Sequence, residues 1–283
     1  MHEHITLSAK QLRNLQLIEL EMLIEVDRIC RMFNIKYNII GGTLLGAVRH
    51  GGFIPWDDDA DLVMFREEYE KFREACKTEL DKSRFYFQDM DVTEGYRWGY
   101  GKIRRKDTIF MRAHQEHMPY EQGVFIDIMP LDNVPDSYIG RKIIDVHCYC
   151  LRKILWSSVG KFTAKSFLIR SWFTLLNILP MSLVKKYVHI YINSCRHIKS
   201  NEVRISFMPN PRSDACYHRR WFESNPIMEF EGINLCGIED YDGFLKWEFG
   251  DYMQLPSIEN RKVHPVSKIK LIKPELNQNE AKK

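Results

Sequence analysis

Apolar residues near the start of the chain recur at a helical period. Between residues 8 and 33 their spacing fits one face of a long amphipathic helix: Leu12, Leu15, Ile18, Leu20, Met22, Ile24, Val26 and Ile29. Ser8 stands at the start of this segment and is a suitable N-cap, because its hydroxyl can accept a hydrogen bond from a free backbone N–H of the first turn. The pattern therefore predicts a helix over residues 8–33.

The pattern then changes to short apolar runs bounded by glycine or proline. KYNIIGG, residues 36–42, predicts a buried strand that turns into a helix over residues 43–50. ADLVMF, residues 60–65, predicts a second strand with a helix over residues 67–80 behind it. Further elements are predicted as follows: a hairpin or strand pair within 96–111, a strand over 124–129, helices across 138–199, a hairpin in FEGINLCGIE and a helix over 241–250. This order predicts an α/β (α+β) protein.

Composition and cysteine usage narrow the class of protein. A chain of 283 residues with 45% hydrophobic and 12% aromatic residues can bury a sizeable core. The seven cysteines are odd in number, form no CxxC pair and lie among apolar residues, which favours reduced thiols and a cytoplasmic location. The start MHEHITLSAK lacks the features of a secretory signal, and FLIRSWFTLLNILPM, residues 167–181, is too short for a membrane span. We expect that segment to form a buried or surface-lying helix.

Positive charge is concentrated in one part of the chain. Residues 141–199 contain eleven Lys or Arg and a single acid, Asp145, and these alternate with large apolar side chains. Such a combination suits an anionic membrane surface or an anionic glycolipid, and a helical bundle with a solvated basic face is the alternative. Nucleic acid is not expected as a partner, because no familiar nucleic-acid motif is present. The segment therefore suggests a protein that is peripheral at the inner face of the membrane.

An acidic cluster carries the strongest chemical signal. IIGGTLLGAVRHGGFIPWDDDADLVM, residues 39–64, joins five glycines to Asp57, Asp58, Asp59 and Asp61. Period-two alternation puts Asp59 and Asp61 on one side of the strand start, where two carboxylates repel unless a cation neutralises them. Asp127 interrupts the apolar VFIDIM run and needs a partner for the same reason. An all-oxygen set without His or Cys predicts Mg²⁺, or Mn²⁺, rather than zinc.

The double glycine before the acids predicts an anion site. Gly41 and Gly42 end a strand and precede the helix that starts at Thr43, so backbone N–H groups can approach a phosphate there. A double glycine alone is most often a turn, and an acidic run alone is usually solvated. Their combination with a third buried acid favours a metal and phosphate site.

Four motifs in order resemble the LicD phosphocholine transferase family, relatives of the fukutins within the nucleotidyltransferase fold. They are GGTLLGAVRHGGFIPWDDDADL, KIRRKDTIF, GVFIDIMPLDNVP and FGDYMQLPSIENR, and the resemblance extends roughly over residues 17–264. The superfamily pattern of Gly-Gly, Asp-x-Asp and a later carboxylate is matched by these residues: Gly41, Gly42, Asp59, Asp61 and Asp127. Asp57 matches a further acid that the fukutin-like branch uses near its metal, and Asp58 is expected in a loop or behind the site.

The resemblance implies a nucleotidyltransferase-like mixed sheet flanked by helices, with a helical insertion. Four parts of the chain are expected: a catalytic core over 1–137, a basic helical insertion over 138–200, a part over 201–274 that completes the catalytic domain, and a flexible tail over 275–283.

The implied reaction is transfer of phosphocholine from CDP-choline to a hydroxyl of a cell-surface glycan or glycolipid precursor, such as lipopolysaccharide or teichoic acid, with release of CMP. Asp59 and Asp61 would hold the metal and the donor diphosphate, and Asp127, or a metal-bound oxygen near it, would orient and deprotonate the acceptor hydroxyl. Two alternatives stay open. One is a sister enzyme that transfers phosphoethanolamine, a polyol phosphate or a nucleotide, and the other is a non-catalytic protein that binds Ca²⁺ and docks on a membrane.

Cationic and aromatic residues near the motifs are the candidates for ligand contact. Arg49 follows the predicted helix, and Lys102 and Arg104 share one face of a strand, so all three are candidates for phosphate, with Thr43 beside them. A choline head requires an aromatic surface, for which we favour Trp56 because it adjoins the acids. Further aromatic and histidine candidates are Tyr96, Trp98, Tyr100, Tyr120, His50 and His264.

Overall fold

The computed structural model describes residues 5–209, 216–261 and 263–276. Helix α1 (Ala9–Phe33) begins at the predicted cap, where the Ser8 hydroxyl accepts a hydrogen bond from the backbone N–H of Gln11. The Gln11 side chain in turn accepts from the backbone N–H of Ser8, which completes a capping box. This prediction is confirmed. The predicted tail over 275–283 lies outside the described residues from position 277 onward.

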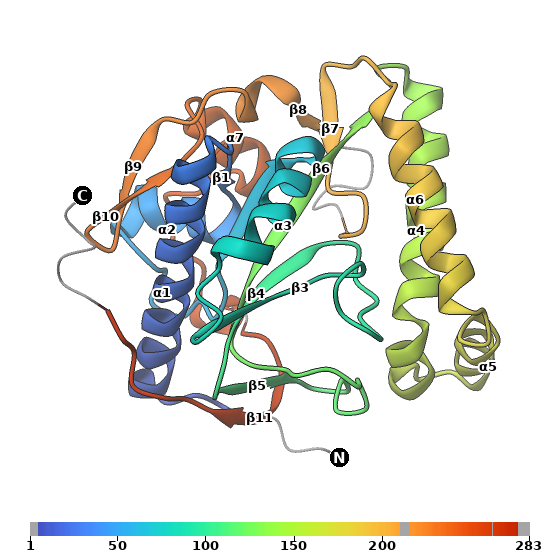
Figure 1. Ribbon diagram of the computed structural model, residues 1–283, viewed down its shortest axis with the longest axis horizontal. Coiled ribbons are helices and arrows are strands. Elements are labelled where there is room, and N and C mark those ends of the chain that lie inside the picture. Colours follow the sequence, from blue (N-terminus) through green and yellow to red (C-terminus); the bar gives the residue numbers. More distant parts are fainter. Residues whose placement is uncertain (1–4, 210–215, 262, 277–283) are drawn as a thin grey trace.

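A mixed sheet forms the centre of the molecule (Figure 1). Its strands, in spatial order, are β1 (Asn38–Ile39), β2 (Asp61–Phe65), β6 (Phe125–Val134), β4 (Gly101–Arg105) and β3 (Phe85–Gln88). β2 and β6 are parallel, whereas the other neighbours are antiparallel. The far end of β6 pairs in antiparallel fashion with β7 (Glu202–Arg204), which in turn pairs with β8 (Tyr217–His218). β6 is therefore the long strand around which the other elements are arranged.

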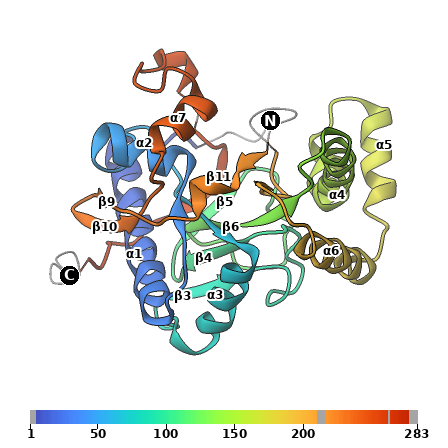
Figure 2. The same ribbon diagram turned by 90° about the horizontal axis from the view of Figure 1, so that it is seen from above.

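Helices cover both faces of this sheet. α1 and α3 (Arg66–Glu79) pack against β6 and against each other. α2 (Gly41–His50) contacts β2 and α7 (Tyr241–Phe249). Figure 2 shows α3 and α7 on opposite sides of β6. The predicted class, a mixed sheet flanked by helices, is confirmed.

Two smaller strand pairs complete the fold. β9 (Ile227–Phe230) and β10 (Ile233–Cys236) form the predicted hairpin. β5 (Ile109–Arg112) pairs with β11 (Val266–Lys270), which the sequence did not predict. The predicted pairing within residues 96–111 is therefore wrong. Both edges of β4 are already occupied, by β3 and β6, so β5 is paired with a strand from the other end of the chain.

Several element boundaries differ from the prediction. α2 begins at Gly41 rather than at residue 43, and β1 is only two residues long. β6 runs on to Val134, beyond the predicted end at residue 129, because the following residues pair with β2 and then with β7. β3 was not predicted. These differences bring the glycines into the first turn of α2, next to the start of β2.

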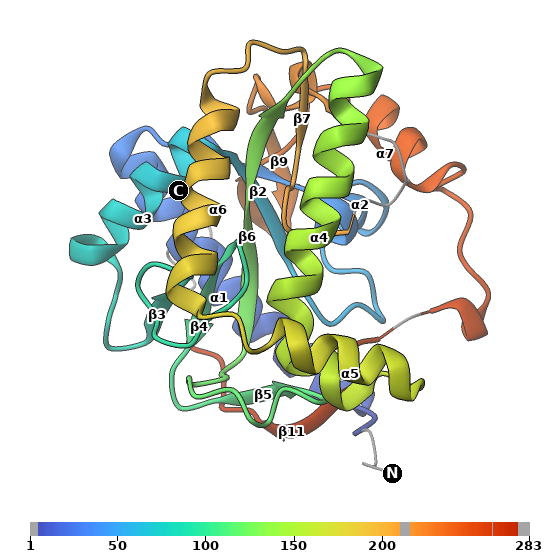
Figure 3. The same ribbon diagram turned by 90° about the vertical axis from the view of Figure 1, so that its right-hand side faces the viewer.

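The segment after β6 folds as three helices, α4 (Tyr138–Thr163), α5 (Phe167–Leu176) and α6 (Met181–Arg196). Figure 3 shows α4 and α6 side by side in front of β6, with α5 across one end. α4 and α6 share a buried cluster, separate from the main core, that includes Cys148, Leu151, Val184 and Val188. The predicted helical insertion is thus confirmed, whereas the division of the chain at residues 138 and 200 stays a prediction.

Among the described helices, no single one is long and apolar enough to cross a membrane. α5 and α6 reach the necessary length and apolar character only when taken together, and the chain bends by 82° between them. α5 itself lies on the surface, with Phe173 its one buried residue, as one of the two predicted alternatives has it.

Candidate active site

Strand register brings two acids and a lysine into one row. Asp61 on β2 lies opposite Asp127 on β6, and Asp127 lies opposite Lys102 on β4. Residues paired in this way project from the same face of a sheet, so the three side chains are neighbours. The Lys102 ammonium forms an ion pair with the Asp127 carboxylate. Asp59, two residues before Asp61, is directed toward the same side.

Electrostatics show that these acids lack sufficient positive charge. Burial, and then the charges of Asp59 and Asp127, raise the pKa of Asp61 well above its usual value. Burial also raises the pKa of Asp59 to about 6, although Arg112 opposes the shift. The described part of the chain provides no hydrogen bond or ion pair to the Asp61 carboxylate. An oxygen-rich site short of cations fits a divalent metal such as Mg²⁺ or Mn²⁺.

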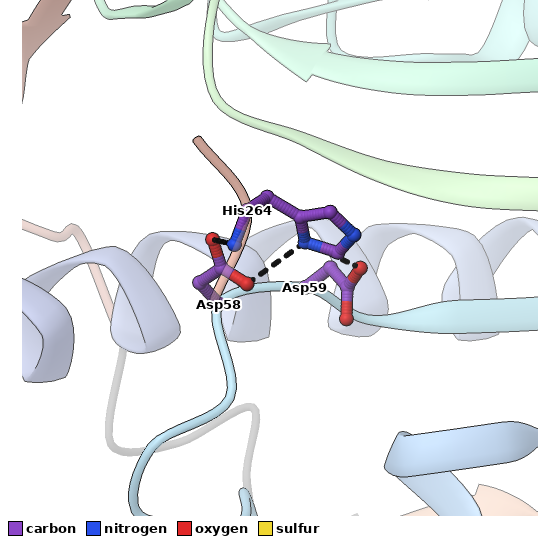
Figure 4. A group of neighbouring side chains, drawn as sticks. All are labelled: Asp58, Asp59 and His264. Atoms are coloured by element: carbon purple, nitrogen blue, oxygen red, sulfur yellow. Dashed lines mark hydrogen bonds and ion pairs between the residues drawn. The ribbon is translucent and has the colours of Figure 1, made fainter. Parts of the chain in front are cut away.

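His264, from the C-terminal part of the chain, contacts Asp58 and Asp59 in the acidic loop (Figure 4). Its backbone N–H donates to Asp58 Oδ2 at 3.0 Å, and its ring Nδ1 lies 2.9 Å from Asp58 Oδ1 and 3.3 Å from Asp59 Oδ2. Within the described residues this trio could also hold a metal ion, since one ligand atom of each lies within 4.8 Å of the others. Asp58, which was expected in a loop or behind the site, does lie in the loop before β2, where it is buried and has His264 as its partner.

The first turn of α2 lies directly against the acids. A Cβ atom on Gly42 would come within 2.4 Å of Asp57 Oδ2, so only glycine permits this approach. Gly41 has φ +59°, and a Cβ there would lie 3.7 Å from Asp61 Oδ2. The Thr43 hydroxyl accepts a hydrogen bond of 2.8 Å from the backbone N–H of Asp61. The glycines thus allow carboxylates to approach, and their contact with a phosphate stays a prediction.

A pocket of about 740 Å³ opens in front of the acids. Asp59, Asp61 and Asp127 form one part of its wall, and five cationic side chains form another: Lys102, Arg104, Arg112, Arg152 and Lys153. Arg152 and Lys153 come from α4, and Arg112 comes from β5. The insertion and the central sheet therefore contribute jointly to one cavity, which combines acids for a metal with cations for phosphate oxygens.

Three of the cationic side chains lie close to one aromatic ring. The Phe125 ring lies 3.4 Å from Lys102 Nζ, 4.9 Å from the Arg104 guanidinium and 5.3 Å from that of Arg112. Arg104 is held further by Gln88 Oε1 at 2.6 Å and by the carbonyl of Gly123 at 2.7 Å. Burial lowers the pKa of Lys102 to about 8, although the Asp127 charge opposes the shift. The cations therefore have fixed positions before any ligand arrives.

Three predicted ligand-contact residues lie elsewhere. Arg49 donates from Nη1 to the carbonyl of Tyr252 at 2.6 Å, and the face of Trp56 is covered by Arg261 at 4.0 Å. The His50 ring packs edge-on against Trp56 at 6.1 Å. The pocket lining within the described residues includes none of the three. Its aromatic wall is formed instead by Trp98, Tyr100, Phe110, Phe125, Tyr149 and Trp156.

Comparison with known proteins agrees with this geometry. The family model described as LicD/FKTN/FKRP, nucleotidyltransferase domain, matches residues 34–147, which contain both acidic strands. The lipopolysaccharide cholinephosphotransferase LicD of Haemophilus influenzae is 28% identical over 269 residues, which cover 90% of this chain and 96% of that relative. The chain is thus similar to proteins of the LicD family, in its acidic strands and over most of its length. A further match is to the human ribitol 5-phosphate transferase FKRP, 53% identical over 34 residues, which are 12% of this chain and 7% of that relative.

The site contains one more acid that sequence reasoning missed. Glu19 on α1 is only 1% exposed, and its Oε2 has no hydrogen-bond partner within the described residues. Burial, and then the charges of Asp59 and Asp58, raise its pKa well above its usual value. One feature of the sequence could have indicated that Glu19 is buried: it lies next to Ile18 within the apolar pattern of the first helix.

The acids of the site should make the stability of the metal-free protein depend on pH. Burial, and then Asp59 and Asp58, raise the pKa of Asp57 from 3.8 to about 8. The folded state therefore retains a proton that the unfolded chain loses, and stability falls as pH rises from about 4 to about 8. We expect the Tm without metal to decrease by roughly 5 °C or more between pH 5 and pH 8, and Asp57→Asn to reduce this slope in thermal unfolding. An unchanged slope in Asp57→Asn, with the exposed Asp251→Asn as control, would contradict the assignment.

Proposed function

We propose that this protein is a metal-dependent phosphotransferase that moves phosphocholine from CDP-choline to a hydroxyl of a cell-surface glycan or glycolipid precursor, with release of CMP. One observation carries the proposal. Asp59, Asp61 and Asp127 converge on a pocket whose other walls are cationic and aromatic, in a chain that aligns with a cholinephosphotransferase over 90% of its length. The class of reaction follows from the site together with the family.

The acids and the cations have separate roles in this proposal. Asp59, Asp61 and Asp127 would hold Mg²⁺ or Mn²⁺, with Asp57 beside them, and the ion would supply positive charge against the donor diphosphate. Lys102 and Arg112, which lie beside Asp127 and Asp59, bind phosphate oxygens and stabilise the charge that develops as the bond to CMP breaks.

In the proposed reaction, Asp127 acts on the acceptor. Its carboxylate orients the acceptor hydroxyl and takes its proton while the hydroxyl oxygen forms the new bond to the phosphorus of phosphocholine. The phosphorus–oxygen bond to CMP breaks in the same step. Lys102, paired with Asp127, holds this carboxylate in place.

The aromatic wall favours choline over other alcohols. A quaternary ammonium cannot donate a hydrogen bond and is bound by aromatic faces. Trp98 and Trp156 offer such faces in the pocket, with ring centroids 5.5 Å apart at 44°. The second candidate is transfer of another phospho-alcohol or of a nucleotide, and it is supported by the 34-residue segment that is similar to a human protein named as a ribitol 5-phosphate transferase.

A reducing cytoplasm is the proposed compartment. All seven cysteines are free, and burial raises the pKa of several of them, among them Cys216 to about 11, which keeps these thiols protonated and unreactive. The proposed partners are the CDP-alcohol donor and a glycan or glycolipid acceptor. No role for nucleic acid is included.

A donor panel tests the proposal. Purified protein with Mg²⁺ or Mn²⁺ and a cell-envelope glycolipid extract is offered CDP-choline, CDP-ethanolamine, CDP-ribitol, CDP-glycerol or nucleoside triphosphates, and CMP or pyrophosphate release is measured. We expect metal-dependent CMP release with CDP-choline that is at least tenfold faster than with the other donors. Faster CMP release from another CDP-alcohol would show that this compound, and not CDP-choline, is the donor. Pyrophosphate release would indicate nucleotide transfer. Absence of both products with every donor would refute a transferase.

A further inference from the structure

The α5 surface is apolar to a degree that the fold does not explain. Phe167 is 78% exposed and Leu168 is 77% exposed, whereas Phe173 is the one residue of the helix that is buried. The remaining exposed apolar residues of α5 and the turn after it are Ile169, Trp172, Leu175, Ile178 and Leu179. A contiguous exposed apolar surface of this kind marks an interaction site.

The apolar surface continues along the outer faces of α4 and α6. Ile139, Ile143 and Val146 on α4 are exposed at spacings of four and three residues, which place them on one helix face. Leu183, Tyr187 and Ile190 repeat this spacing on α6. The two stripes are adjacent where the His147 and Tyr187 rings lie 5.4 Å apart. Figure 3 shows both helices facing outward, with α5 across their end. These residues of α4, α5 and α6 are called the outer face below.

Charge around the outer face is positive. Lys165 and Arg170 flank the start of α5, and Lys186 lies between Leu183 and Tyr187 on α6; all three are exposed. No ion pair to these three side chains is found within the part of the chain that the structure describes. Asp145, the one acid of the segment, is already paired with Arg204. The outer face therefore has uncompensated positive charge beside exposed apolar groups.

We propose that the outer face docks on an anionic lipid bilayer, with α5 lying in the interface and its apolar side chains inserted among the lipids. Apolar residues flanked by lysine and arginine are the combination that binds such surfaces. A second copy of this chain would bring the same positive charges together, so charge complementarity selects the anionic membrane.

If the proposed function is correct, docking in this orientation would also bring the active-site pocket close to lipid-linked acceptors. Tyr149 and Trp156 of α4 line the active-site pocket and are 54% and 40% exposed. The same helix therefore borders both the pocket and the outer face. A lipid-linked acceptor could reach the acids while its lipid remains in the bilayer.

Vesicle flotation tests the docking without donor or metal, so its outcome is independent of turnover. Full-length protein is mixed with phosphatidylcholine vesicles containing about one third phosphatidylglycerol, and with pure phosphatidylcholine vesicles. We expect at least tenfold stronger binding to the anionic vesicles, weakened by salt. Phe167→Ser/Leu168→Ser should reduce this binding at least tenfold, and Lys165→Gln/Lys186→Gln should reduce it about fivefold per lysine.

The matched control is Ile227→Ser/Ile258→Ser, which removes two exposed apolar residues outside the insertion and should leave binding unchanged. Circular dichroism establishes that each variant is folded. Equal binding of wild type to both vesicle types, or unchanged binding in both outer-face variants, would overturn the proposal. A wild-type dimer in light scattering that Phe167→Ser/Leu168→Ser converts to a monomer would assign the outer face to self-association instead.

Discussion

Asp61→Asn is expected to abolish turnover and at the same time to stabilise the metal-free protein. Asp61 is half-buried beside Asp59 and Asp127, and its pKa is raised well above the usual value by burial and by those two charges. Replacing it with a neutral amide of the same shape removes repulsion from the folded state, but it also removes a ligand oxygen for the metal. Loss of one such stabilising group from the transition state should cost at least about a thousandfold in rate.

Two measurements on the same preparations separate these effects. CMP release should fall to the background rate, while the Tm in EDTA at pH 8 should equal or exceed that of wild type. Asp251→Asn, an exposed change of the same chemistry, should alter neither quantity. If Asp61→Asn kept wild-type turnover, the acids would not form the metal site, and a lower Tm would mean that the carboxylate has a partner in the folded protein.

Arg66→Met is expected to cost about 3–5 kcal/mol of folding free energy. Arg66 begins α3, and its guanidinium forms two hydrogen bonds to Asp132 on β6, Nε to Oδ1 at 2.7 Å and Nη2 to Oδ2 at 2.8 Å. Both residues are buried, with exposures of 8% and 1%. Removing the arginine would leave the Asp132 carboxylate buried without its partner, and this uncompensated charge, rather than the lost bond itself, dominates the cost.

Urea unfolding provides the measurement. The double variant Arg66→Met/Asp132→Leu should recover most of the lost stability, because replacing both charges removes the unpaired acid. Lys71→Met, which breaks an exposed pair with Glu68 on the same helix, should leave the urea midpoint nearly unchanged. A midpoint for Arg66→Met close to that of wild type would show that Asp132 finds another partner or is protonated.

Local sequence signals predicted much of the fold. The capping box at Ser8 and the apolar spacing behind it defined α1, and FEGINLCGIE contained the turn and the second strand of the β9–β10 hairpin, with only the last residue of the first strand. The Gly-Gly and DDDAD motifs placed Asp59 and Asp61 near one another, because their spacing within one strand entry requires it. These features depend on residues that are close in the chain, so their physical causes can be recognised in the sequence.

The site as a whole was decided by contacts between distant segments. Asp127 lies beside Asp61 only because β2 and β6 pair in parallel register, and Arg112 enters the pocket on β5, which the C-terminal β11 holds in place. His264 reaches Asp58 across 206 positions of sequence. The sequence by itself therefore determined which acids this protein concentrates and where α1 begins. Which cations and aromatic rings face those acids was decided by the tertiary structure, because strand pairing and helix packing depend on buried surfaces that fit only when the whole chain is folded.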